Sequence, residues 1–133
     1  MPQLSDDELK QIATHFHDVG VSVGESRLKA IHQGTPLNDA RIVRLLGLQW
    51  NLINTSSSFY VQAAQVTLAN ADVAEKSVTD ATTQANEAIK TINDINKAIT
   101  IGSSVAVLAP AIYSGDMKQV GAAVKGVWDA IKG

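Results

Sequence analysis

The sequence has no cysteine and only small shares of proline, aromatic residues and charge. Its 133 residues include 3 prolines, 5% aromatic residues and 18% charged residues, whereas charged residues usually make up about a quarter of a chain. The lack of cysteine excludes disulfides, thiolate metal sites and cysteine nucleophiles. Because large rings are few, the core must be built mostly from Ala, Val, Ile and Leu, which favours closely spaced helices.

The length and charge of the chain indicate one domain without a general affinity for polyanions. A chain of 133 residues is one domain by length, so we expect a single domain over residues 1–133. The net charge of −2 predicts no general attraction to nucleic acid or to an anionic membrane. Residues 1–11 are acidic and polar, unlike a signal peptide. We therefore expect a cytoplasmic location, or export by a route that reads no such signal.

Local signals predict where the helices begin and end. Ser5 and Glu8 form a capping-box pattern that starts the first helix. Gly34 is a helix-ending glycine, after which Thr35 is the expected N-cap and Pro36 the first turn of the next helix. Near the C-terminus, Gly115 is the expected helix-ending glycine and Asp116 the expected N-cap of the last helix. The short link at Gly34 predicts that the first two helices lie antiparallel.

Small and apolar residues recur in alternating steps of three and four from residue 43 to residue 109. This spacing is a sustained heptad pattern, which we call the heptad seam. Its members are Val43, Leu46, Trp50, Ile53, Ser57, Tyr60, Ala64, Thr67, Ala71, Ala74, Val78, Ala81, Ala85, Ala88, Ile92, Ile95, Ile99, Gly102, Ala106 and Ala109. Alanine dominates the middle of the seam, which suits helices packed at short distance. Gly20 and Gly24, four residues apart, predict a further close approach of two backbones.

One uninterrupted helix over the whole seam would be about 100 Å long. We therefore expect a turn in residues 68–76, where Asn70 can end one helix and Asp72 with Glu75 can cap another. The alternative is a long rod that a second copy of the chain completes. With the turn, the sequence predicts an all-α fold: an antiparallel four-helix bundle with long helices and an Ala-rich heptad seam. The helices are expected near residues 5–33, 36–70, 72–113 and 116–132.

The sequence contains no pattern that predicts catalysis, a metal site or a cofactor. His15 and His17 are two residues apart, so on a helix they point to different sides, and His32 lies near a helix end. Most carboxylates fall at expected helix starts, where capping accounts for them. Asp80, Glu87 and Asp94 repeat every seven residues off the seam, which is typical of a solvated face. We expect a protein that is not an enzyme.

The charges are distributed unevenly, and this carries the functional expectation. Between Arg44 and Asp72 the only ionisable side chain is that of Tyr60. Either this helix lies in the interior or its surface is covered by another subunit or partner, because uncharged polar groups lose water more easily than ions do. We expect self-association or binding of a protein partner through uncharged, apolar helix faces. The candidate interaction residues are the large rings Trp50, Phe59, Tyr60 and Trp128.

The C-terminal third of the chain admits a membrane interpretation. Residues 98–115 carry no charge, and residues 116–132 follow as an amphipathic helix. Such a hairpin forms half of a bundle core, lies on or enters a membrane after a conformational change, or binds an apolar small molecule. The pattern is similar to that of helical pore-forming toxins and secretion translocators, although it identifies no family. The candidate membrane-contact residues are Val105, Val107, Leu108, Ile112, Lys118, Lys125 and Lys132.

Overall fold

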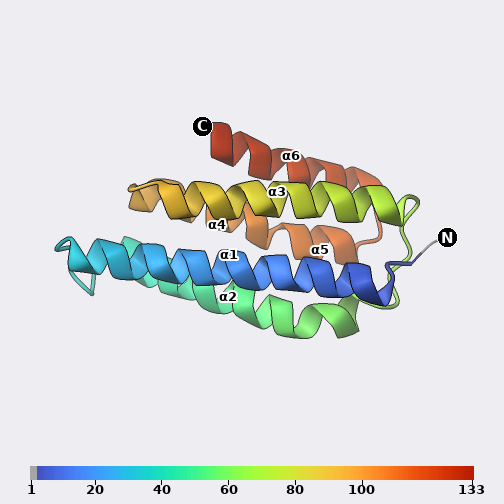
Figure 1. The fold of residues 1–133 in the computed structure, drawn as a ribbon, viewed down its shortest axis with the longest axis horizontal. Coiled ribbons are helices and arrows are strands. Elements are labelled where there is room, and N and C mark those ends of the chain that lie inside the picture. Colours follow the sequence, from blue (N-terminus) through green and yellow to red (C-terminus); the bar gives the residue numbers. More distant parts are fainter. Residues whose placement is uncertain (1–2) are drawn as a thin grey trace.

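The computed structural model describes residues 3–133, and within them it contains helices and no strand. The helices are α1 (Asp6–His32), α2 (Ala40–Ala63), α3 (Ala71–Thr91), α4 (Ile95–Ala106), α5 (Leu108–Tyr113) and α6 (Met117–Lys132). Only Val107 separates α4 from α5, so these two continue as one rod and five helical rods pack together (Figure 1). The all-α prediction is confirmed, but the structure has five rods where four helices were expected.

Most of the predicted helix ends are where the local signals place them. The Glu8 backbone N–H donates to Ser5 Oγ at 3.1 Å, and the Ser5 N–H donates to Glu8 Oε1 at 2.8 Å, which completes the capping box. Gly34 and Gly115 have positive φ angles of 101° and 71°, a conformation that glycine adopts without strain. Asp116 caps α6 by accepting a hydrogen bond from the Lys118 N–H at 2.9 Å.

The start of α2 differs from the prediction. Thr35 and Pro36 belong to the connection, and the N-cap is Asp39, whose Oδ1 accepts from the Arg41 N–H at 2.9 Å. The expected turn after α2 is present, so the chain does not form one long rod. However, α2 ends at Ala63, and Asn70 makes no side-chain capping bond at the start of α3. The connection is therefore longer than a turn at Asn70 alone would require.

The expected helix 72–113 is interrupted before and after α4. At the first interruption Ile92 has extended backbone angles, φ −87° and ψ 137°. Asp94 then starts α4 by accepting a hydrogen bond from the Asn96 N–H at 2.9 Å. The assignment of Asp94 to a solvated helix face was therefore wrong, because this residue is an N-cap. The second interruption, at Val107, does not change the direction of the rod (Figure 1).

The rods alternate in direction along the chain (Figure 1). The α4–α5 rod contacts α1, α2, α3 and α6, so the apolar core runs along it. The close approach predicted for the glycines of α1 is confirmed. A Cβ at Gly20 would lie 3.0 Å from Ile53 Cγ1 and 3.2 Å from Leu52 Cβ, and one at Gly24 would lie 2.7 Å from the Gln49 side chain. These contacts, to Gln49, Leu52 and Ile53, hold α2 close against α1.

Candidate functional site

Helix α2 carries two apolar stripes, and only one of them is in the core. The inner stripe consists of six buried residues, Ile42, Leu45, Leu48, Leu52, Phe59 and Ala63. The second stripe is the heptad seam, which begins one residue later, at Val43. One residue corresponds to a rotation of about 100° around a helix. The seam of α2 is therefore turned away from the core.

The exposed side of α2 is apolar or uncharged along most of its length. The exposed fractions are 59% for Val43, 56% for Trp50, 38% for Tyr60 and 76% for Val61. Leu46 and Ile53 are half-buried between them. We call this surface the α2 outer face, defined by Val43, Leu46, Trp50, Ile53, Ser57, Tyr60 and Val61. No Asp, Glu, Lys, Arg or His occurs from residue 45 to the end of the helix.

Exposed apolar residues also occur on α1, beside α2. Val21 and Leu28 of α1 are exposed, and together with Gln49 of α2 they line a groove between the two helices. Leu37, in the connection that precedes α2, is also exposed. Scattered single hydrophobic residues are normal on a protein surface, whereas a continuous apolar strip is typical of an interaction site. On α1 the exposed apolar residues lie beside Glu25 and Arg27, which line the same groove, so the apolar strip is that of the α2 outer face.

The two ends of the α2 outer face differ in charge. Arg41 and Arg44 lie at the N-terminal end of α2. Arg41 forms an ion pair with Asp39 at 3.0 Å, and this hydrogen-bonded guanidinium lowers the pKa of the Asp39 carboxyl. Arg44 Nη2 donates to Ser103 Oγ at 3.3 Å. Because the acceptor is a hydroxyl, this bond does not neutralise the charge of Arg44. This end is therefore basic.

The other end of the face adjoins the start of α1, since α1 and α2 are antiparallel (Figure 1). The first turn of α1 contains Asp6, Asp7 and Glu8. The Asp6 carboxylate lies beside the Tyr60 hydroxyl and raises the pKa of that phenol through a hydrogen bond. The α2 outer face thus runs from a basic end at Arg44 to an acidic end at Asp6.

The four predicted ring residues lie in different environments. Trp50 and Tyr60 are on the α2 outer face. Phe59 is fully buried, with its ring 5.3 Å from that of Phe16 in an edge-to-face arrangement. Trp128 is half-buried and packs against the core from α6. Only the first two are at the surface of the same helix.

The candidate membrane-contact residues are also divided. Val105, Leu108 and Ile112 are fully buried, whereas Val107 is 55% exposed. The three lysines of α6 are exposed, and one of them, Lys125, bonds Asp129 at 2.9 Å. Among the described residues, the helical stretch Ile95–Tyr113 is long and apolar enough to cross a membrane by length and composition. A core helix of a soluble protein meets the same criterion.

Two cavities near this rod have different character. An apolar groove of about 400 Å³ lies between the α4–α5 rod and α6, and Val107, Pro110, Ala122 and Gly126 are among its lining residues. This groove is apart from the alanine-rich seam of α3, whose Ala81 and Ala85 are fully buried. The groove is open to solvent along its length, so it does not enclose a ligand.

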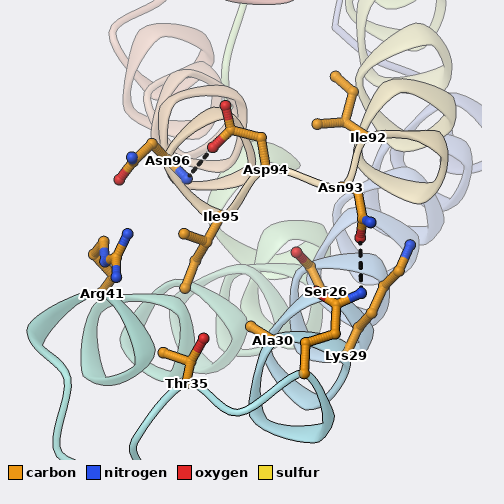
Figure 2. Close-up of a pocket in the computed structure, with 11 residues that line it drawn as sticks. Ser26, Lys29, Ala30, Thr35, Arg41, Ile92, Asn93, Asp94, Ile95 and Asn96 are labelled. Atoms are coloured by element: carbon orange, nitrogen blue, oxygen red, sulfur yellow. Dashed lines mark hydrogen bonds between the residues drawn. The ribbon is translucent and has the colours of Figure 1, made fainter.

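The second cavity is a polar pocket at the end of the bundle (Figure 2). It lies where α1 ends and α4 begins, and its volume is about 240 Å³, below the roughly 300–1,000 Å³ of small-molecule sites. Gln33 Nε2 donates to Asn93 Oδ1 at 3.3 Å across it, and Asp94 bonds the Asn96 N–H. Lys29 and Arg41 also line the pocket, and Arg41 forms an ion pair with Asp39 at 3.0 Å. The pocket thus lies between the connection from α1 to α2 and the connection from α3 to α4.

The His, Asp and Glu side chains of residues 3–133 are dispersed. No cluster of three or more His, Asp or Glu side chains that could hold a metal ion occurs among these residues. His17 lies 3.6 Å from Asp18, and both side chains are about half exposed. Sequence reasoning missed the exposed valines and leucines around Trp50. A signal for them was present, because α2 has more apolar positions than one face can hold.

Comparison with protein-family models, curated proteins and solved structures finds no match to this chain. Its function must therefore be argued from the arrangement of its own side chains.

Proposed function

We propose that this protein acts by binding another protein chain through the α2 outer face, and that it is not an enzyme. The observation that carries the proposal is the exposed half of the heptad seam, with Val43, Trp50 and Tyr60 at heptad positions on one side of a helix. Residues that recur in steps of three and four along a helix are the contact positions of paired helices. Their partner in the fold is missing, because the inner stripe of α2 already fills the core.

The chemistry of the face also supports a binding function. A covered surface must lose its water, and this loss is more costly for ions than for Asn, Ser and Gln side chains. Asn51, Asn54 and Ser57 occupy polar positions of α2 where an ordinary surface helix would carry Lys or Glu. Trp50 supplies a large ring, the residue type most enriched among the strongest contributors to binding. Such a surface is suited to being buried against another helix.

A photo-crosslinking experiment tests this proposal in the cell that produces the protein. A benzophenone amino acid at Val61 on the α2 outer face is expected to give a discrete covalent adduct with a protein. The matched control places the same group at Gln84, which is exposed on α3. Adding Trp50→Asp should abolish the Val61 adduct, because a charge in the middle of the face opposes its burial. Equal labelling at both positions, or no adduct at Val61, would contradict the proposal.

Membrane action is the second candidate, and the stretch Ile95–Tyr113 favours it. In this function the α4–α6 hairpin would leave the bundle, and the buried Val105, Leu108 and Ile112 would contact lipid. The test is dye release from vesicles of phosphatidylcholine and phosphatidylglycerol. Release by the wild-type chain should be lost with Val107→Asp, which the fold tolerates because Val107 is exposed. Absence of release by the wild-type chain would refute this candidate.

A further inference from the structure

The α2 outer face fits one occupant in particular, a second copy of the same face. We propose that two copies of this chain pair through their α2 outer faces, with the two helices antiparallel and related by a two-fold axis near residues 51 and 52. This inference rests on the proposed function and specifies its partner. A two-fold pair is self-complementary, so each contact occurs twice.

The order of side-chain sizes along the face favours the antiparallel direction. In that direction Val43 lies opposite the partner's Tyr60, and Leu46 lies opposite the partner's Ser57. Trp50 then lies opposite the partner's Ile53. Each layer joins a larger side chain to a smaller one, which fills space evenly. In a parallel pair, Trp50 would meet a second Trp50 and Ser57 a second Ser57, so one layer would be crowded and another empty.

The charges at the ends of the face favour the same direction. An antiparallel pair places the Arg44 end of one copy over the Asp6 and Asp7 end of the other, where opposite charges attract. A parallel pair would bring two Arg44 side chains together and two Asp6 side chains together. Antiparallel helices also place the positive end of each helix dipole beside the negative end of the other. Packing and electrostatics therefore select one geometry.

The face is long enough for a paired-helix contact. From Val43 to Tyr60 it extends for about 26 Å, at 1.5 Å per residue. Gly47, beside Leu46, has no heavy atom within 4 Å of the position of a Cβ, so the backbone there is open to a neighbour. Val21 and Leu28 of α1 add exposed apolar side chains on one side, next to Glu25 and Arg27. The contact would therefore involve α1 as well as α2.

The absence of cysteine makes a direct test possible. Val43→Cys and Tyr60→Cys each introduce one thiol at an exposed position. The purified chains are treated with a short bis-maleimide crosslinker, alone and as a mixture. In the antiparallel pair, residue 43 of one copy lies beside residue 60 of the other, while the two copies of residue 43 are about 25 Å apart. We expect no crosslink with either variant alone and a covalent dimer in the mixture.

Sedimentation of the unmodified chain provides an independent measurement. We expect a species of twice the chain mass of 14.1 kDa. Trp50→Asp should raise the dissociation constant of this dimer at least tenfold, as expected for the loss of a central aromatic contact. A dimer of Val43→Cys alone would overturn the antiparallel geometry. If the chain stays monomeric at high concentration and the mixture gives no crosslink, the proposal that the partner is a second copy of this chain is overturned. A photo-adduct at Val61 with a mass other than that of this chain would then leave the proposed function standing.

Discussion

Helices α2 and α3 carry the same heptad pattern, yet the pattern faces opposite environments in the two helices. On α3 the seam residues Ala74, Val78, Ala81 and Ala85 are buried, at 2% exposure or less. On α2 the corresponding positions are less covered: Val43 and Trp50 are more than half exposed, Tyr60 is 38% exposed, and Leu46 and Ile53 are half-buried. A periodic stripe thus identifies one side of a helix but does not determine whether that side is covered by the fold.

The difference arises from the residues outside the seam. The remaining surface of α3 carries charges such as Asp72, Lys76 and Asp80, so only its alanine-rich side can face the core. On α2 the stripe of Leu45, Leu52 and other large aliphatic residues competes with the seam. Leu52 of this stripe packs closely against Gly20 of α1, and Leu45 and Leu52 are both fully buried. The seam of α2 is consequently left outside.

The largest expected effect comes from placing the same charge on the two seams. Ala81→Asp puts an unpaired carboxylate where the side chain is fully buried, which costs several kcal/mol, comparable to the whole stability of a domain of this size. Trp50→Asp puts the carboxylate in water and should change the free energy of unfolding of the monomer by about 0.5 kcal/mol or less. Urea unfolding followed by circular dichroism, at low protein concentration, measures both.

The outcome of this pair of variants can contradict the comparison in either direction. A well-folded Ala81→Asp variant would mean that the α3 seam is not in the core. An unfolded Trp50→Asp variant would mean that the α2 outer face is needed by the single chain. In the second case the exposed ring could not be assigned to partner binding.

The sequence predicted those parts of the fold that depend on neighbouring residues. The capping box at Ser5 and the helix-ending glycines at 34 and 115 need only local contacts, so their sequence patterns are reliable. The break between α3 and α4 was missed because Ile92 and Ile95 continue the apolar spacing across it. The Asp94 cap that makes the break can also be interpreted as one more charge on a solvated face.

The candidate site was predicted in part, for a related reason. The lack of charge after Arg44 indicated α2, and of the four candidate rings Trp50 and Tyr60 lie exposed on that helix. Phe59 is adjacent to Tyr60 in the sequence, but it points into the core, about 100° away around the helix. Sequence periodicity alone could not rank the two apolar stripes, because the rank depends on how α2 packs against the other helices.

A smaller pair of effects comes from Gly20, which lies on α1 against α2, and Gly47, which lies on the exposed side of α2. Gly20→Ala introduces a Cβ at 3.0 Å from Ile53 Cγ1 and 3.2 Å from Leu52 Cβ. The Cβ of Leu52 is fixed to its backbone, so α1 and α2 must move apart. We expect a loss of about 1 kcal/mol or more in the free energy of unfolding, because overpacking outweighs the helix preference of alanine.

Gly47→Ala should have the opposite sign, because no atom lies within 4 Å of the added Cβ on the outer side. Here the helix preference of alanine acts alone, and we expect a gain of up to about 1 kcal/mol. Urea unfolding of both variants, at a concentration where the chain is monomeric, gives the two values. If Gly47→Ala were destabilising under these conditions, the backbone of α2 at that point would already be covered within a single chain. The outer and inner sides of α2 would then not differ in the way that the exposed seam requires.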